Sequence, residues 1–222
     1  MMPNIFFIAD QHFHHKNILT FKRSDNGLPL RQFDDVDEMN EHMVEQHNRV
    51  VKPEDKVYFL GDVTMSRNAK GLEILGRLNG EKILVKGNHD LCSAHQYLNY
   101  FKDIRGTHQF DGMILSHIPI HPESLARWGC NVHGHLHSNE VKLWDMMFET
   151  EKIDPRYLCV SVEQIAYTPI SLEDTKKLIK SRLETYNKFW YNIILDNWIN
   201  LWTNKNLFFL HQISFLQCVL SL

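Results

Sequence analysis

Short apolar runs, rich in β-branched and aromatic residues, recur along the chain, and each one ends in a polar or glycine-containing loop. They cover residues 4–9, 56–60, 81–85, 113–115, 131–132 and 157–162. Runs of this length and composition predict buried strands. The first run stops at Asp10 and is too short for the apolar part of a signal peptide or for a membrane span. We therefore expect a strand at this end of a cytoplasmic protein.

Segments with helical periodicity lie between and after these runs. In residues 35–51 the apolar side chains fall near one face, and Asp35 is placed to cap the helix. In residues 69–78 leucines recur every three residues. A third helix is expected over residues 171–183, with Ser171 as its cap. Alternating strands and helices predict an α/β fold with layered, mixed β-sheets flanked by helices, because the later strands are too close together for helical crossovers.

The overall composition is that of an ordinary folded protein. The chain has 222 residues, 43% of them hydrophobic and 23% charged, which is enough for one domain with its own core. The formal net charge of -3 gives no nucleic-acid signature. Four cysteines without a C-x-x-C pair indicate reduced thiols rather than a disulfide framework or a zinc ribbon.

The composition changes near residue 186, which predicts a domain of residues 1–185 and an apolar extension of residues 186–222. Residues 189–222 hold only two charged side chains but three of the five tryptophans. Asparagine and aspartate interrupt the apolar run, so we expect no transmembrane span. One interpretation of the extension is a packing helix or a weakly selected appendage. The other is a surface for homo-oligomer formation or peripheral membrane contact.

Histidine is the one residue type in unusual number, with 14 copies. Many of these histidines stand with aspartate or asparagine directly after the predicted strands. The strand-end residues of this kind are Asp10, His12, Asp62, Asn88, His89, Asp90, His117, His135 and His137. Because ligands of open α/β sheets bind outside the carboxyl ends of the strands, we expect these side chains to lie together.

The chemistry of this set favours divalent metal ions. Carboxylate, imidazole and amide oxygen together suit Mn²⁺, Fe²⁺, Zn²⁺, Co²⁺ or Ni²⁺. So many ligands exceed one tetrahedral site but suit two adjacent ions that share a carboxylate, and such a pair can activate a water and clamp two phosphate oxygens. Asp10 and His12, like His135 and His137, are two residues apart, so in an extended backbone both members point to one side. A glycine precedes three of the candidate ligands and lets the backbone turn sharply there.

The motifs also resemble those of a known family. In chain order they are D-x-H, G-D, G-N-H-D, an isolated H and G-H-x-H, a combination that resembles the calcineurin-like metallophosphoesterases. Residues 10–17 resemble the first motif of a small bacterial and phage subgroup, D-x-H-F-x-H-x-N. The resemblance covers about residues 3–183, and it departs at Met65, where the family often has aspartate, and at His14, where the subgroup usually has glycine. The resemblance implies a metallophosphoesterase-type layered fold. It also implies that the protein comes from a bacterium or from a phage-infected bacterial cell.

The resemblance implies two metal-binding groups that share one residue. The first group is Asp10, His12 and His137. The second group is Asn88, His117 and His135, and the shared, bridging residue is Asp62. Two divalent ions, Mn²⁺ in preference to Fe²⁺, Zn²⁺, Ni²⁺ or Co²⁺, would supply a bridging hydroxide as the nucleophile. His89 would act as the general acid toward the leaving group, and Asp90 would orient it.

The reaction implied is hydrolysis of a phosphodiester or phosphomonoester. His15 and Asn17 are candidate contacts for the phosphate or leaving group, although both could be plain loop residues, and Arg31 could hold a phosphate bidentately. The absence of a basic stripe favours a small phosphorylated or nucleotide-type substrate over long nucleic acid. The alternative is a non-catalytic metal-binding scaffold of the same fold that recruits a protein partner. Such scaffolds usually lack metal ligands or the acid histidine, and this sequence retains both.

Overall fold

The computed structural model describes residues 3–145 and 149–204, and the side chains of these up to residue 188. The chain divides into two compact units, Met1–Ser181 and Arg182–Leu222. All the strands lie in the first unit, which is the subject of the following paragraphs. No helix in the described part of the chain is long and apolar enough to cross a membrane.

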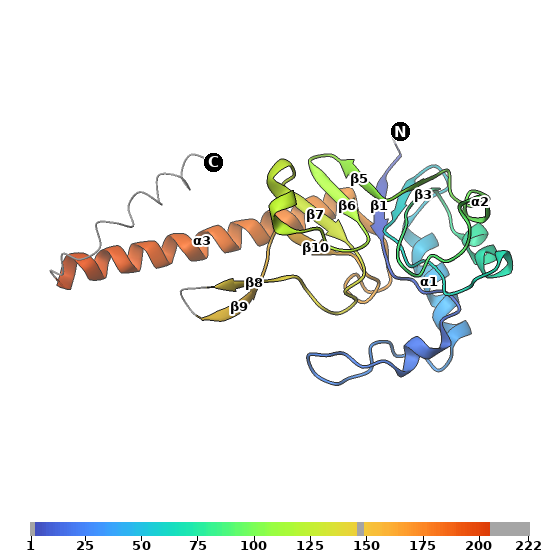
Figure 1. Cartoon of the computed structure of the whole chain (residues 1–222), viewed down its shortest axis with the longest axis horizontal. Helices are drawn as coiled ribbons and strands as arrows, with labels where there is room; N and C mark the ends of the chain where they lie inside the picture. The colour runs from blue at the N-terminus through green and yellow to red at the C-terminus, as the bar shows by residue number, and fades with distance from the viewer. Residues whose placement is uncertain (1–2, 146–148, 205–222) are drawn as a thin grey trace. The chain divides into compact units, whose positions relative to one another are not determined.

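The first sheet has five strands in the order β11-β1-β2-β3-β4. Two of them, β1 and β3, are labelled in Figure 1. Their bounds are Ile5–Ile8 for β1, Lys56–Phe59 for β2, Glu81–Val85 for β3, Asp103–Arg105 for β4 and Ile170–Ser171 for β11. Strands β1 to β4 are parallel, and β11 pairs antiparallel with β1. The parallel arrangement places the carboxyl ends of β1, β2 and β3 along one edge of the sheet.

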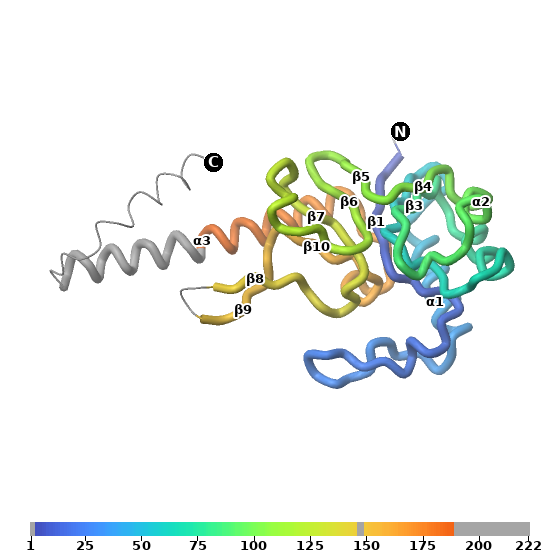
Figure 2. Tube along the Cα trace, in the orientation of Figure 1, coloured from blue at the N-terminus to red at the C-terminus, as the bar shows by residue number. Residues whose placement is uncertain are grey.

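The second sheet has four strands in the order β10-β7-β6-β5, and β5, β6 and β7 can be followed side by side in Figure 2. Their bounds are Thr107–Phe110 for β5, Met113–Ser116 for β6, Cys130–His133 for β7 and Tyr157–Cys159 for β10. Strands β6, β7 and β10 are parallel, and β5 is antiparallel to β6. A separate hairpin is formed by β8 (Lys142–Asp145) and β9 (Thr150–Ile153).

The helices begin where the sequence offers a cap. The carboxylate of Asp35 accepts hydrogen bonds from the first backbone amides of α1 (Val36–Val50), at 2.8 and 2.9 Å. In α3 (Leu172–Asn204) Ser171 Oγ accepts from the Asp174 amide at 3.0 Å. The other helices of the described residues are the short α2 (Ala94–Tyr97) and three 3₁₀ helices, η1 (Lys16–Thr20), η2 (Ala69–Arg77) and η3 (Pro122–Arg127).

Two apolar layers hold the first unit together. Alternate residues of β1 face opposite ways, so Phe7 packs between the two sheets while Phe6 and Ile8 pack toward α1 and η2. The layer between the sheets draws on β2 and β3 from one side and on β6, β7 and β10 from the other. The outer layer includes Met39 and Met43 of α1. Both faces of the first sheet are therefore buried, which explains why its strands are continuously apolar runs.

The two sheets join just beyond β1. The Ala9 amide donates to the Val160 carbonyl at 2.9 Å, and the Val162 amide donates to the Ala9 carbonyl at 3.1 Å. This pairing brings the end of β1 against the segment that follows β10. The carboxyl ends of both sheets consequently open onto the same place in the molecule.

The expected mixed α/β architecture with flanking helices is confirmed, and each of the six predicted runs overlaps a strand. The short strands β4, β5, β8, β9 and β11 were not predicted, because their sequences lack a sustained apolar run. The segment 69–78 is a 3₁₀ helix rather than an α-helix, which fits its strict three-residue leucine spacing. The third helix does not end near residue 183 but continues to Asn204. Residues 205–222 of the expected extension lie outside the described residues.

A buried histidine, His47, makes the stability of the fold depend on pH. His47 of α1 is 1% exposed, its ring stacks on Phe59, and Nε2 lies 3.0 Å from the Asn79 carbonyl, to which the neutral ring donates. Burial is the main cause that lowers the pKa of His47 to about 4. The hydrogen bond to the Asn79 carbonyl opposes this shift in part, and the positive charge of Lys82 adds a smaller lowering. The ring is therefore neutral in the folded protein at pH 7.

We expect the folded state to lose stability as the pH falls from 6.5 toward 4, because the unfolded chain takes up a proton that folded His47 refuses. The loss amounts to about 2 kcal/mol between pH 8 and pH 5. Replacing His47→Gln should remove that part of the pH dependence in urea unfolding followed by circular dichroism. The exposed His95→Gln serves as control and should leave the pH profile of the wild type unchanged.

Candidate metal centre

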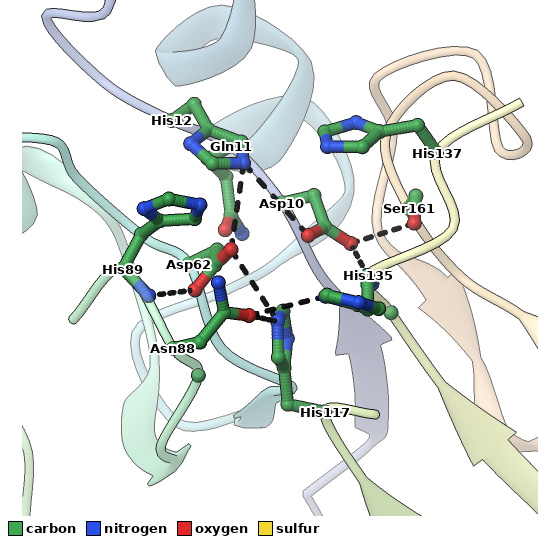
Figure 3. Close-up of polar contacts among 12 residues, drawn as sticks. Asp10, Gln11, His12, Asp62, Asn88, His89, His117, His135, His137 and Ser161 are labelled. Atoms are coloured by element: carbon green, nitrogen blue, oxygen red, sulfur yellow. Dashed lines mark hydrogen bonds and ion pairs between the residues drawn. The ribbon is translucent and has the colours of Figure 1, made fainter. Parts of the chain in front are cut away.

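The predicted strand-end residues converge where the two sheets meet (Figure 3). The first sheet contributes the residues after β1, β2 and β3, and the second sheet those after β6 and β7. From the first sheet these are Asp10, His12, Asp62, Asn88 and His89, and from the second sheet His117, His135 and His137. Two groups among them could hold metal ions, and the ligand atoms of each group lie within 4.8 Å of one another.

The first group is Asp10, His12 and His137. Asp10 Oδ2 accepts hydrogen bonds from Ser161 Oγ at 2.6 Å and from the His135 amide at 2.8 Å. The other oxygen, Oδ1, is buried without a hydrogen-bond partner, as are both ring nitrogens of His12. Asp10 Oδ1 and His12 Nε2 are 3.9 Å apart, which is too long for a hydrogen bond but suits two ligands of one cation.

Burial sets the charge of this first group. It raises the pKa of Asp10 to about 6 and lowers the pKa of His12 to about 2, so the His12 ring is neutral. A buried acceptor left without a partner costs about 1–3 kcal/mol, and here several face one another. A cation bound between them would satisfy these acceptors together, so the residues present fit a metal ion.

The second group is Asp62, His117 and His135. His117 Nδ1 lies 2.8 Å from the Leu60 carbonyl, so in the neutral ring Nδ1 donates and Nε2 is left as an acceptor. That Nε2 atom lies 2.8 Å from Asn88 Oδ1 and 3.3 Å from Asp62 Oδ2. Asn88 Oδ1 is also 3.1 Å from His135 Nδ1, so the amide oxygen lies beside the ligand atoms of this second group. Converging acceptors again fit a cation.

Asp62 lies between the two groups. Its Oδ2 is 3.6 Å from His12 Nε2 on one side and 3.3 Å from His117 Nε2 on the other. Its Oδ1 accepts the His89 amide at 2.7 Å, which fixes the plane of the carboxylate. Asp62 is therefore within reach of ligands from both groups.

The backbone at the ligands is strained. Five candidate ligands have left-handed φ angles: Asp10 (59°), His12 (49°), Asp62 (55°), His135 (71°) and His137 (52°). Non-glycine residues seldom adopt this region, which costs on the order of 1 kcal/mol each. The expectation that each D-x-H or H-x-H pair converges through an extended backbone was therefore wrong. The side chains converge because tight left-handed turns follow the strands.

The glycines of the motifs make room rather than only turning the chain. A Cβ added at Gly87 would lie 2.2 Å from Asp62 Oδ1, and one added at Gly134 would lie 2.5 Å from Asp10 Oδ2. Neither glycine has a positive φ, whereas Gly61 does, at +88°. Close approach of two loops therefore requires glycine at positions 87 and 134.

Asp90 contacts the backbone rather than His89. Its carboxylate accepts hydrogen bonds from the amides of Gly87, Asp62 and Val63 at 2.7, 2.9 and 3.0 Å. Tyr97 adds a hydroxyl donor to the same carboxylate at 3.3 Å. Among the described residues no hydrogen bond joins Asp90 to His89, so the geometry favours a role in holding together the loops after β2 and β3.

The three predicted substrate contacts have different surroundings. His15 lies beside the first group, with its half-buried ring 5.4 Å from that of His12. Asn17 is exposed on η1, and no contact with a candidate ligand is seen in the described part of the chain. Arg31 is 2% exposed, and its guanidinium donates to protein groups, which does not favour a role in binding phosphate.

Two residues of the site were missed by the sequence analysis. Ser161 donates to Asp10, and Glu163 Oε1 lies 3.0 Å from His137 Nδ1. Burial alone would raise the pKa of Glu163, but Arg31 and His137 outweigh it and lower the pKa to about 2. Both residues follow β10, which ends at Cys159, whereas the predicted run continued to residue 162 and so concealed another polar strand end.

Comparisons with known proteins agree with this architecture but assign no activity. No family model matches the chain. It is 35% identical over 183 residues to the uncharacterized protein MJ1445 of Methanocaldococcus jannaschii, covering 81% of this chain and 93% of that protein. The chain therefore belongs to the same family as MJ1445.

Two solved structures are also similar. The protein of unknown function AQ665 from Aquifex aeolicus has a TM-score of 0.57 and 29% identity, covering 79% of this chain and 99% of that one. Phosphopantetheinyl hydrolase from Mycobacterium tuberculosis has a TM-score of 0.35 and 14% identity, covering 77% of this chain and 94% of that one. The second likeness is too distant to bear on function.

Replacing Gly87→Ala should disturb the centre, because the added methyl group has to displace the Asp62 carboxylate. We expect a loss of about 1–3 kcal/mol in stability and weaker binding of added Mn²⁺, measured by calorimetry. Gly106→Ala is the matched control, since a Cβ at Gly106 meets nothing within 4 Å. Wild-type Mn²⁺ affinity in Gly87→Ala would contradict the assignment of Asp62.

Proposed function

We propose that this protein is a dinuclear metal-dependent phosphoesterase. The observation that carries the proposal is the position of Asp62, whose Oδ2 lies within 3.6 Å of a ligand atom in each of two adjacent groups. Two sites that share a carboxylate are suited to hydrolysis at phosphorus. The domain would span residues 1–185 in a metallophosphoesterase-type layered fold, with residues 186–222 as an appended segment.

The chain's own residues would hold two divalent ions. One would be bound by Asp10, His12 and His137, and the other by Asn88, His117 and His135, with Asp62 common to both. Mn²⁺ is the first candidate for this mixture of carboxylate, imidazole and amide ligands, and Fe²⁺, Zn²⁺, Ni²⁺ and Co²⁺ are the others. When bound, the ions would supply an acidified water and electrostatic stabilisation of the phosphate oxygens.

In this proposal His89 would donate a proton to the leaving group. Its amide is anchored on Asp62 Oδ1, and its half-buried ring lies 5.6 Å from the ring of His12. A ring that is fixed at its backbone and still accessible can donate a proton to the departing oxygen of a phosphoester. His15, whose ring lies 5.4 Å from that of His12, is the remaining candidate for a substrate contact.

The substrate we propose is a small phosphoester of nucleotide type, either a diester or a monoester. The net charge of -3 offers no general attraction for long nucleic acid. Residues 20–31 follow the first motif in the sequence and carry Lys22 and Arg23, so this loop is a candidate for substrate selection.

The purified protein should hydrolyse bis-p-nitrophenyl phosphate when Mn²⁺ is added, and a chelator should abolish this activity. Release of p-nitrophenolate and metal content per chain are measured on the same samples. Two bound ions without hydrolysis of any ester in a panel of cyclic, linear and oligomeric nucleotides would favour the scaffold alternative instead. Failure to bind two ions would contradict the dinuclear centre itself.

Replacing His89→Ala should reveal the general acid through the leaving group. We expect kcat to fall by about 10²-fold or more for esters with alkyl leaving groups, which need a proton, and much less for p-nitrophenyl esters. The plot of log kcat against leaving-group pKa should therefore become steeper. An equal loss for all leaving groups would show that His89 does not protonate the departing oxygen.

A further inference from the structure

Arg31 is a buried cation beside the first metal group. Among the fully buried side chains of the described residues it is the largest by volume. Nη2 donates to the Asp10 carbonyl at 2.5 Å, and Nη1 donates to the Gln11 carbonyl at 2.8 Å. The guanidinium thereby holds the strained left-handed turn that carries Asp10 and His12.

The same guanidinium holds Glu163. Arg31 Nε donates to Glu163 Oε1 at 2.8 Å, and Nη2 lies 2.8 Å from the same oxygen. Glu163 in turn accepts from His137 Nδ1 at 3.0 Å. With Nδ1 acting as the donor, the Nε2 lone pair of His137 is left available as a ligand atom.

Arg31 and Glu163 therefore support all three members of the first group. Arg31 holds the turn that carries Asp10 and His12, and Glu163 holds His137. The second group is supported differently. His117 is held by the Leu60 carbonyl, and the Asp62 amide and Gly87 amide are held by Asp90. No hydrogen bond or ion pair in the described part of the chain joins Arg31 or Glu163 to the second group.

We propose that Arg31 and Glu163 are positioning residues that organise the Asp10–His12–His137 group for its ion and leave the Asp62–His117–His135 group unaffected. The inference rests on the proposed two-metal centre. It also replaces the expected role of Arg31 in binding phosphate with a role behind the ligands. Neither residue touches the reacting atoms, so both act through Asp10, His12 and His137.

The charges explain why the two residues are needed together. Without Glu163, the positive charge of Arg31 would repel an ion in the first group. Without Arg31, Glu163 would be a buried carboxylate lacking its compensating charge, and the turn at Asp10 would lose two hydrogen bonds. A lysine at position 31 would keep the charge but could not span two carbonyls and a carboxylate in the fixed fork of an arginine.

Titration of the metal-free protein with Co²⁺ tests this proposal. Visible absorption reports the number and geometry of bound ions, and calorimetry reports their affinities. Wild-type protein should bind two ions. In Glu163→Gln and in Arg31→Lys one ion should bind with wild-type affinity and the other at least tenfold more weakly. Glu41→Gln is the matched control, because Glu41 also pairs with an arginine, Arg77, but on the surface.

The spectrum of the remaining ion identifies which group is affected. It should match the spectrum of His137→Ala, which lacks a ligand of the first group, and differ from that of His117→Ala. Two ions at wild-type affinity in Glu163→Gln and Arg31→Lys, or equal weakening of both ions, would overturn the proposal. So would unfolding of both variants in chelator, monitored by circular dichroism, because the residues would then serve the fold and not one group. Wild-type protein that binds fewer than two ions would instead contradict the proposed function.

Discussion

The candidate metal centre consists of hydrogen-bond acceptor atoms that the fold holds close to one another. Asp10 Oδ1, Asp62 Oδ2 and the Nε2 atoms of His12 and His117 converge within a few ångströms at the junction of the two sheets. In water such groups would separate and hydrate, but here the apolar layers beneath them fix the strands that carry them. A cation bound between these acceptors would lower the free-energy cost of the arrangement, so the residues present fit a metal ion.

The sequence predicted the strands and the polar residues that directly follow them, because buried strands are recognisable as short apolar runs. Apolar runs predicted β1, β2 and β3 to within about one residue, and the polar residues directly after them proved to lie together. Such residues can be found without a structure because a parallel sheet aligns its carboxyl ends whatever its details are.

The parts that the sequence did not predict depend on contacts between residues far apart in the chain. Arg31 lies 132 positions from Glu163, and nothing local distinguishes a buried arginine in a polar loop from one that binds phosphate. Asp90 follows His89 directly, yet its carboxylate turns toward the amides of Asp62 and Val63. The left-handed turns at the ligands were equally hidden, since their residue types favour other conformations and only the surrounding structure holds them.

The candidate metal centre lies beside the backbone pairing of Ala9 with Val160 that joins the two sheets, so metal binding would also affect how firmly the sheets are held together. Each group takes ligands from both sheets: Asp10 and His12 act with His137, and Asp62 acts with His117 and His135. An ion held in either group would therefore be a cross-link between the two sheets, in addition to the apolar layer between them and the backbone pairing of Ala9 with Val160 and Val162. Separating the two sheets would then require release of the ion. The side chains that bind the ions would therefore also stabilise the packing of one sheet against the other.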